Sequence, residues 1–434
     1  MISLHASRDP TGKLNPEPWL EDERTVAVMR ALKSGGADVR YVGGCVRDAI
    51  AKRPINDIDI GTPESPDVVT RRLTAAGIKA VPTGVEHGTV TAVTDGKSYE
   101  ITTLRQDVET DGRRAVIAYT DDWIVDSSRR DFTINALSAT QSGDVYDYHD
   151  GISDLAHGRI RFIGRAEDRV QEDYLRILRY FRFFAHFGRP PYDDAAFNAC
   201  RKYAEHLSTI SAERIRHELL RTLAANEPED AFIMMRDAHV LEAILPEATE
   251  IGTLRAAAWL ASRGVIIDGL RPHPLRRLGA VLSPNCDGIG VAGRLKLSRK
   301  EANRLIAMKK FAPLFVVPEA IGNVQSRIQK LGNEAVADAL ILAWAARLAD
   351  QAKLPHDETV LRRETLEMAF AWTPPELPIG GDDVKARGIP TGPEVGTLLR
   401  KVEDWWTDGG FNADREACLK QLDDIIADKG NEDK

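Results

Sequence analysis

The stretches YVGGCVRD, residues 41–48, and NDIDI, residues 56–60, decide the expected fold of this chain. The apolar residues before Gly43 are typical of a short strand, and the paired glycines predict a turn that opens a helix. Two glycines let the backbone approach a ligand closely, and the N–H groups at a helix start suit a phosphate. Arg47, in the first turn of that helix, adds a guanidinium for the same phosphates. The pattern therefore predicts a phosphate-binding turn.

Asp57 and Asp59 are two residues apart on the next predicted strand. A period of two places both carboxylates on one face of that strand. Adjacent carboxylates repel each other unless a cation bridges them, and Mg²⁺ takes carboxylate oxygens while keeping positions open for phosphates and water. Two solvated acids on a polar strand are the better interpretation of an isolated DxD. The glycine turn upstream favours a Mg²⁺ site for in-line displacement at phosphorus instead.

The rest of the chain predicts an α+β fold. Residues 88–93 and 98–103 alternate β-branched and other residues around Asp95-Gly96, which predicts a hairpin, and residues 67–76 predict a helix between strands. After about Glu167 the pattern is that of helices of 10 to 20 residues, broken by glycine and proline. We expect a small head with a mixed sheet, followed by a long helical part.

Composition narrows the class of protein. A chain of 434 residues exceeds one core, so two to four domains are expected. No apolar run reaches the roughly 18 residues that span a bilayer, and the first 20 residues are too polar for a signal peptide. The four scattered cysteines predict neither a disulfide framework nor a zinc site, which fits a reducing cytoplasm.

The charge is unevenly distributed. The net charge of −8 argues mildly against a nucleic-acid partner. Residues 159–221, however, hold about 13 Lys/Arg against about 9 Asp/Glu, a local excess that suits phosphate contacts. A merely solvated basic helix face explains the same excess equally well.

Residues 172–184, EDYLRILRYFRFF, combine large apolar residues at helical spacing with charges at every third position. On one continuous helix each step of three lags by about 60°, so Asp173 and Arg176 are neighbours, Arg179 is still adjacent, and Arg182 has turned away. Arginine offers only donors and aspartate only acceptors, so together they can pair with the edge of a base. The apolar residues are expected to pack the helix in place.

These blocks together resemble a known family. GGCVRD followed by DIDI resembles the nucleotidyltransferase fold shared with DNA polymerase β, and more closely the class II tRNA nucleotidyltransferases, or CCA-adding enzymes, with their bacterial poly(A) polymerase relatives. The resemblance continues, in order, through EHGTV (86–90), EITTLR (100–105), DGRR (111–114), RRDFTINAL (129–137), DYHDGISDL (147–155), EDYLR (172–176) and ISAERI (210–215).

The resemblance implies roles for the head residues. Asp57 and Asp59 would ligate the catalytic Mg²⁺. Gly44 and Arg47 would hold the incoming triphosphate. Glu100 is a candidate third carboxylate beside the metal, although an exposed hairpin residue is an equal interpretation of it.

Seven further residues would contact the nucleotide: Arg130, Asp131, Asn135, Asp173, Arg176, Arg179 and Arg182. In this scheme Arg130 contacts the nucleotide, while Asp131 and Asn135 lie near the sugar. Asp173 and Arg176 read the base with support from Arg179, and Arg182 orients its neighbours or meets a phosphate. The protein itself would then act as the template.

The implied activity is template-independent addition of CCA to tRNA 3′ ends from CTP and ATP, with tRNA as partner and Mg²⁺ as cofactor. The alternatives are an A-adding tRNA nucleotidyltransferase or poly(A) polymerase, and a catalytically inactive RNA-binding protein. Residues 81–90 resemble the CCA-adding branch, and DGRR at 111–114 favours full CCA or A addition over CC addition. Residues 377–396 resemble the tail of the bacterial enzymes, and helix-capping turns explain them equally well.

The resemblance also predicts a domain plan. It consists of an N-terminal extension (1–21), a polymerase β-like catalytic head (22–165), a helical neck with the nucleotide-selecting helix (166–225), a helical body (226–373) and a helical, tRNA-binding tail (374–434). The oligomeric state is left open.

Overall fold

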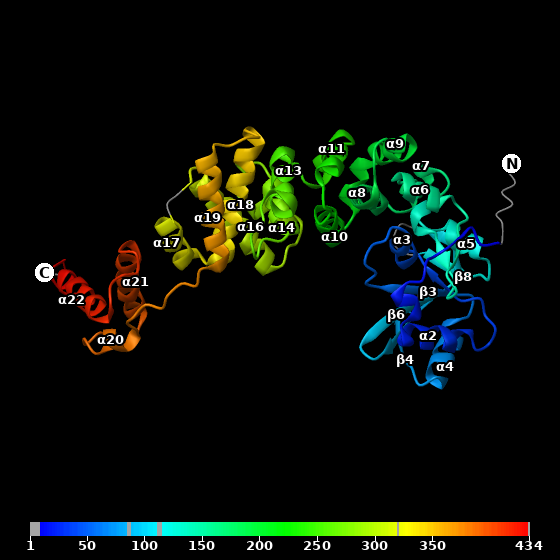
Figure 1. Ribbon diagram of the computed structural model, residues 1–434, viewed down its shortest axis with the longest axis horizontal. Coiled ribbons are helices and arrows are strands. Elements are labelled where there is room, and N and C mark those ends of the chain that lie inside the picture. Colours follow the sequence, from blue (N-terminus) through cyan, green and yellow to red (C-terminus); the bar gives the residue numbers. More distant parts are fainter. Residues whose placement is uncertain (1–8, 85–87, 111–114, 319–320, 433–434) are drawn as a thin grey trace. The chain divides into compact units, whose positions relative to one another are not determined.

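The computed structural model describes residues 9–84, 88–110, 115–318 and 321–432. The chain forms two compact units, Met1–Pro246 and Glu247–Lys434. Unit 1 combines a mixed sheet with helices, and the described part of unit 2 consists of helices and one isolated β-bridge (Figure 1). The expected α+β class is therefore confirmed. The narrower domain boundaries given above stay predictions.

The elements of unit 1 are β1 (Gly12–Lys13), α1 (Pro18–Glu21), α2 (Glu23–Lys33), β2 (Arg40–Val42), α3 (Gly44–Ile50), β3 (Ile58–Thr62), α4 (Pro66–Ala75), β4 (Lys79–Gly84), β5 (Thr89–Thr94), β6 (Lys97–Thr103), β7 (Arg105–Thr110), β8 (Ala115–Tyr119), α5 (Trp123–Ser128), the 3-10 turn η2 (Thr133–Asn135), β9 (Ser138–Ala139), β10 (Asp144–Tyr146), α6 (Gly151–His157), α7 (Ala166–Glu172), α8 (Leu175–Phe187), α9 (Asp194–Lys202), the 3-10 turn η3 (Ala204–Thr209), α10 (Ala212–Leu223), α11 (Glu229–Asp237) and α12 (Val240–Ile244).

The elements of unit 2 are α13 (Ile251–Trp259), the π-helical turn η4 (Leu260–Gly264), α14 (Pro274–Val281), α15 (Ile289–Arg294), α16 (Arg299–Phe311), the 3-10 turn η5 (Ala312–Phe315), α17 (Ile321–Leu331), α18 (Asn333–Asp350), α19 (His356–Ala371), α20 (Gly381–Lys385), α21 (Pro393–Asp408) and α22 (Arg415–Glu432).

The main sheet of unit 1 has the strand order β1-β10-β9-β2-β3-β6-β5-β4, with β7 and β8 forming a separate pair. Strands β3 and β6 run parallel, and their register sets Asp59 beside Glu100. The predicted hairpin is confirmed as β5–β6, because Asp95 and Gly96 both take positive φ (45° and 76°) as a tight hairpin turn requires. The sheet therefore brings an acid from a distant part of the sequence to the predicted DxD strand.

The core of the head lies between this sheet and the helices packed on it. Helix α4 contacts β4, β5 and β6 as well as α2 (Figure 1). Tyr41, Ile60 and Tyr99 from the central strands are fully buried there. Because β-branched and aromatic side chains fill this interior, β2 and β3 hold the turn at Gly43 and the carboxylate of Asp59 on a rigid scaffold.

The continuous helix predicted over residues 172–184 is wrong. Helix α7 ends at Glu172, Asp173 takes an extended conformation (φ −158°, ψ 107°), and α8 begins at Leu175. The Asp173 Oδ1 atom accepts a hydrogen bond from the Leu175 N–H (3.1 Å). Aspartate readily makes such local bonds in competition with the helix, and here that bond satisfies a backbone donor at the start of α8.

Two further expectations concern membrane spans and disulfides. No helix among the described residues combines the length and apolar character that a membrane span needs. Cys45, Cys200, Cys286 and Cys418 are all free thiols in this structure.

Candidate functional site

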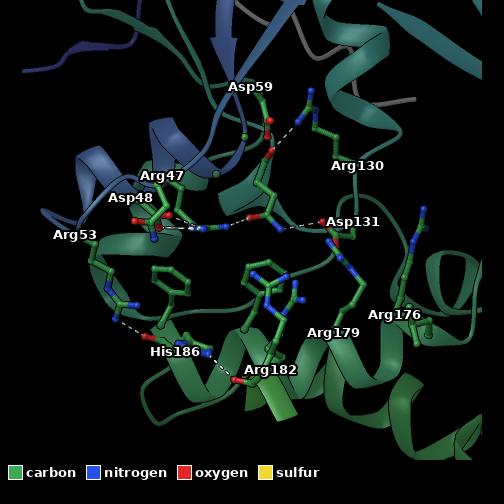
Figure 2. Close-up of a pocket in the computed structure, with 18 of the residues that line it drawn as sticks. Arg47, Asp48, Arg53, Asp59, Arg130, Asp131, Arg176, Arg179, Arg182 and His186 are labelled. Atoms are coloured by element: carbon green, nitrogen blue, oxygen red, sulfur yellow. Dashed lines mark hydrogen bonds and ion pairs between the residues drawn. The ribbon is translucent and has the colours of Figure 1, made fainter. Parts of the chain in front are cut away.

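A cavity of about 1040 Å³ opens within unit 1 (Figure 2). Its lining includes ten arginines and four aspartates: Arg47, Arg53, Arg105, Arg129, Arg130, Arg176, Arg179, Arg182, Arg214 and Arg221, with Asp48, Asp59, Asp131 and Asp173. An excess of cations this large favours a polyanionic ligand, and guanidinium groups bind phosphate oxygens in a bidentate manner.

Most of the predicted site residues meet in this cavity. Ten of the twelve line it: Gly44, Arg47, Asp59, Arg130, Asp131, Asn135, Asp173, Arg176, Arg179 and Arg182. The other two, Asp57 and Glu100, are exposed carboxylates beside Asp59, the first two residues before it and the second on the paired strand β6. Residues far apart in the sequence are thus gathered at one place.

The glycine turn forms one wall of the cavity. Gly43 takes φ 69° and ψ −119°, a conformation that side chains with a Cβ rarely adopt, and α3 starts at the next residue. A Cβ added at Gly43 would lie 3.0 Å from Arg130 Nη1. Glycine is thus needed at position 43 for two reasons. It tolerates these dihedral angles, and its missing Cβ leaves room for Arg130.

Replacing Gly43 by alanine is therefore expected to lower the free energy of unfolding by about 1–3 kcal/mol, because the backbone becomes strained. Gly36→Ala is the matched control, since Gly36 also has positive φ (82°) but a Cβ there meets nothing within 4 Å. Denaturant titration of both variants measures the difference. Nucleotide affinity should fall only for Gly43→Ala; equal affinities in the two variants would contradict the second role of Gly43.

The carboxylates of Asp57, Asp59 and Glu100 repel one another. Burial and the neighbouring Glu100 carboxylate raise the pKa of Asp59 to about 6, with Asp57 acting in the same direction and Arg130 against it. Among the described residues no three His, Cys, Asp or Glu side chains are already arranged around a metal position. Oxygen donors that repel one another nevertheless suit a hard divalent cation, which would relieve that repulsion.

A chain of hydrogen bonds crosses the cavity. Arg47 donates to Asp48 (3.0 Å) and to Asn135 Oδ1 (2.6 Å), and Asn135 Nδ2 donates to Asp131 Oδ1 (3.0 Å). Asp131 Oδ2 in turn accepts from Arg179 Nε (2.6 Å). Figure 2 shows Arg47 and Asp48 of α3, Asp131, and Arg179 of α8 reaching toward one another. These hydrogen bonds thereby fix the position of the glycine turn relative to helix α8.

Asp131 is the buried centre of this chain. Burial alone would raise the pKa of its carboxyl, but the Arg179 guanidinium and the hydrogen bonds from Asn135 and the Phe132 N–H lower that pKa overall. Arg130 is bound separately, by Asp126 of α5 (3.2 Å), and donates to the Asn135 carbonyl (3.4 Å). The arrangement keeps Asp131 ionised and Arg130 beside Asp59.

The charges of residues 172–182 do not act as the single helical stripe that was predicted. Arg176 donates to Glu172 and to the Arg169 carbonyl. Asp173 Oδ2 instead accepts from Arg214 of α10 (2.6 Å). Although both side chains line the cavity, they are not partners of each other in this structure.

Arg182 forms a buried ion pair. Its side chain is buried and pairs with the buried Glu218 of α10 (2.9 Å). Burial lowers the pKa of Arg182 to about 10, although Glu218 opposes the shift. Of the two roles predicted for Arg182, this geometry favours orienting its neighbours, since an ion pair this well buried fixes α8 against α10.

Several cavity residues were missed from the sequence: Arg53, Arg105, Arg129, Arg214 and Arg221. Arg105, Arg129 and Arg214 lie inside the quoted blocks at 100–105, 129–137 and 210–215, so the sequence indicated their blocks but not their position in the cavity. Glu86 and His87 of the block at 86–90, and the whole block at 111–114, lie outside the described residues.

Comparison with known proteins agrees with this site. Residues 39–161 match the family described as "Poly A polymerase head domain", and residues 193–251 match "Probable RNA and SrmB- binding site of polymerase A". The "CCA tRNA nucleotidyltransferase 1, mitochondrial" of Danio rerio is 30% identical over 407 residues, covering 92% of this chain and 90% of that protein. The chain belongs to the CCA tRNA nucleotidyltransferase family.

Two further matches support membership of the CCA tRNA nucleotidyltransferases. The protein of the same name from Homo sapiens is 32% identical over 392 residues, covering 89% of this chain and 86% of that protein. The Bacillus stearothermophilus CCA-adding enzyme, solved in complex with CTP, has a TM-score of 0.76 and 26% identity, covering 96% of this chain and all of that one. The resemblance read from the sequence is thus confirmed, and the chain is an enzyme of this family.

Proposed function

We propose that this chain adds CCA to the 3′ ends of tRNA from CTP and ATP, without a nucleic-acid template. One observation carries the proposal: a single cavity gathers the glycine turn, the Asp59 carboxylate and the Asp173/Arg176/Arg179 set. The structural relative from B. stearothermophilus, a CCA-adding enzyme, was solved in complex with CTP.

The cavity offers separate places for the parts of a nucleoside triphosphate. Arg47, the N–H groups at the start of α3 and Arg130 would bind the phosphates, because they surround the glycine turn. Asn135 and Asp131, one step further along the hydrogen-bond chain, would meet the sugar. The chain of bonds from Asp48 to Arg179 would keep the triphosphate and the base in a fixed relation.

Mg²⁺ is the cofactor that we propose for this site. Asp57 and Asp59 would hold it, and Glu100 lies in the sheet register to assist them. When bound, the ion would supply Lewis-acid stabilisation of charge on the reacting phosphate. The protein's own contribution is the rigid β3 strand, which sets the position of the carboxylates, and the arginine lining, which neutralises the phosphates.

Base selection would fall to Asp173, Arg176 and Arg179. Each of them is paired in this structure, with Arg214, Glu172 and Asp131 respectively. A base would therefore meet groups whose positions are already held by their partners, so that few side-chain rotamers need to be ordered on binding. Arg182 also lines the cavity, but its ion pair with the buried Glu218 suits it to orient the set through α8.

A tRNA transcript lacking CCA provides the test. We expect addition of two C residues with CTP alone, nothing with ATP alone, and C, C, A with both nucleotides. Products are resolved on sequencing gels. Addition of A only to a CC end would indicate the A-adding enzyme, long A tails would indicate the poly(A) branch, and either result contradicts the proposal. Because Asp57 and Asp59 are both present, a catalytically inactive RNA-binding protein is the weakest of the alternatives.

The cytoplasmic location remains part of the proposal. It rests on the four free cysteines, three of them buried, which fit a reducing compartment. The relatives from fish and human carry the word mitochondrial in their names, so location has to be measured in the source cells.

A further inference from the structure

Two phenylalanines of α8 line the cavity, although no role has been given to them so far. Phe181 and Phe184 are buried, as expected for the apolar residues of this segment. Phe183 and Phe187, four residues apart on the helix, line the cavity, and their rings stack with centres 6.2 Å apart. We call Phe183 and Phe187 the aromatic pair. Core packing alone does not account for Phe187, because its side chain is only half-buried.

Arginines surround the aromatic pair. The guanidinium carbon of Arg47 lies 4.5 Å from the centre of the Phe187 ring and 5.2 Å from that of Phe183. That of Arg53 lies 4.1 Å from the Phe187 centre, and that of Arg179 lies 5.5 Å from the Phe183 centre. Within about 6 Å, a cation is attracted to the negative face of an aromatic ring. The aromatic pair therefore contacts both a phosphate-binding arginine and a base-selecting one.

Arg53 lines the cavity without an acidic partner. It donates to the His186 carbonyl and contacts the Phe187 ring, and no carboxylate of the described residues forms an ion pair with it. Figure 2 shows Arg53 reaching toward His186. Partial desolvation lowers the pKa of Arg53; Asp48 opposes this shift, and the charge of Arg47 adds to it. Two guanidinium groups beside one ring repel each other, and a bound anion would relieve that repulsion.

The position of the Phe187 ring is set by α8. Phe187 is the last residue of that helix, and the Gly188 N–H donates to the Phe184 carbonyl (2.7 Å) where the helix ends. On the other side of Phe187 in the sequence, His186 Nε2 donates to the Arg221 carbonyl of α10 (2.9 Å). The ring is therefore fixed to the helix that carries the base-selecting arginines, whereas the guanidinium groups it contacts come from α3 and the residues after it.

We propose that Phe187 is a positioning residue, which holds the guanidinium groups of Arg47 and Arg53 toward the triphosphate of the incoming nucleotide. The proposal rests on the proposed function only for the identity of that nucleotide. A ring face attracts a guanidinium group without using its N–H donors, so the donors stay available for phosphate oxygens. Hydrogen bonds to Asp48 and Asn135, in contrast, occupy donors of Arg47. Through this ring, the helix that selects the base would also place cations for the phosphates.

The first test replaces Phe187 by leucine, which keeps an apolar side chain that favours a helix but removes the ring. We expect the Kd for CTP to rise by about 5- to 30-fold, which corresponds to the loss of a partly desolvated interaction between cation and ring. The Kd for inorganic tripolyphosphate should rise by a similar factor, because the arginines meet the phosphates and not the base. Phe187→Tyr keeps the ring and should bind both ligands within about twofold of the wild type. Equilibrium dialysis measures the affinity for CTP, and competition with CTP measures that for tripolyphosphate.

Phe311→Leu is the matched control. Phe311 is, like Phe187, the half-buried last residue of its helix, and Lys310 lies over its ring at 5.5 Å, but it belongs to α16 of unit 2 and does not line the cavity. Its Kd for CTP should equal that of the wild type. Equal values in Phe187→Leu would overturn the proposal. A higher Kd for CTP with an unchanged Kd for tripolyphosphate would mean that the Phe187 ring stacks on the base, and would overturn it as well.

A fluorinated series separates the contact with the cations from the shape of the ring. Phenylalanine analogues with one, two or three ring fluorines at position 187 withdraw charge from the ring face while changing its size little. We expect the logarithm of the Kd for CTP and for tripolyphosphate to rise stepwise with the number of fluorines, while the Tm stays the same. If Phe187 only packed the end of α8, the Kd would be constant through the series, and that result would exclude a positioning role.

These binding measurements need no tRNA, so this inference and the proposed function can fail separately. A protein that adds CCA to tRNA but binds CTP equally well throughout the fluorinated series keeps the proposed function and loses the role of Phe187. A graded loss of CTP and tripolyphosphate binding without CCA addition supports the role of Phe187 and contradicts the proposed function.

Discussion

Replacing Asp59 by asparagine is expected to reduce nucleotidyl transfer by about a thousandfold while the fold and CTP binding are retained. Of Asp57, Asp59 and Glu100, Asp59 is the one that lines the cavity, and it pairs with Glu100 in the register of β3 and β6. A metal-binding carboxylate supports several kcal/mol of transition-state stabilisation, and about 4 kcal/mol corresponds to that loss of rate. Single-turnover incorporation of CTP into tRNA measures the rate, and equilibrium dialysis measures CTP affinity.

The stability of this variant gives a second, independent readout. The folded-state pKa of Asp59, about 6, lies above the ordinary value of 3.8, so the ionised side chain destabilises the fold above about pH 4. Removing its charge should therefore leave the Tm at pH 7 unchanged or raised, provided that no divalent metal is added. Asp67→Asn, at an exposed position of α4, is the control for both measurements. Retained nucleotidyl transfer in the Asp59→Asn variant would contradict the assignment of Asp59 as a metal-binding carboxylate.

Added Mg²⁺ should reverse this stability difference. A cation held by Asp57 and Asp59 stabilises the folded state of the wild-type protein and not its unfolded state. The Tm of the wild-type protein should therefore rise with Mg²⁺ concentration. The Tm of the Asp59→Asn variant should rise less. Equal shifts in the two proteins would show that the ion binds elsewhere.

The local parts of this site could be predicted from the sequence because they are encoded locally. The turn at Gly43 and the hairpin at Asp95-Gly96 follow from dihedral angles that few residues tolerate. The DxD strand follows from a two-residue period. Each of these signals lies within a few residues, so no knowledge of the tertiary structure was needed.

Local sequence patterns do not predict the partners of the site residues, since these come from distant segments; Glu100 became a candidate only through the family resemblance. The parallel pairing of β3 with β6 sets Glu100 beside Asp59 across 41 residues of sequence, and Arg214 reaches Asp173 across another 41. The break at Asp173 is of a different kind. The residues on both sides favour a helix, and one hydrogen bond from the Leu175 N–H to the aspartate decides the outcome.

That break changes what Asp173 can do. On a continuous helix its carboxylate would lie next to Arg176, but the extended backbone sends it to Arg214, while Oδ1 holds the start of α8. Two donors from the protein fix the orientation of the carboxylate and leave lone pairs for an exocyclic amine. Cytosine and adenine both present such an amine, whereas uracil and guanine present a carbonyl oxygen in that position. A fixed acceptor would thus select the two correct bases together.

Asp173→Asn is accordingly expected to reduce the preference for CTP over UTP, and for ATP over GTP, by about 10- to 100-fold. The side-chain amide keeps the shape but can turn its NH₂ toward a carbonyl oxygen, and a hydrogen bond to a charged group is worth about 1.5–3 kcal/mol. The measurement is kcat/KM for each of the four nucleotides on tRNA ending in the appropriate nucleotide. Asp194→Asn, at an exposed position of α9, controls for a general change of charge.

Comparing the kcat/KM values of the four nucleotides distinguishes base reading by Asp173 from a structural role. If Asp173 only held α8, its loss would slow all four nucleotides by a similar factor, and the preference ratios would stay as in the wild type. That outcome would exclude Asp173 as a reader of the base. Arg214→Ala should reproduce part of the loss of selectivity, since it frees the carboxylate to rotate, and it should do so without converting an acceptor into a donor. UTP and GTP incorporation should therefore rise in Asp173→Asn but not in Arg214→Ala, because only the first variant offers a donor to the wrong base.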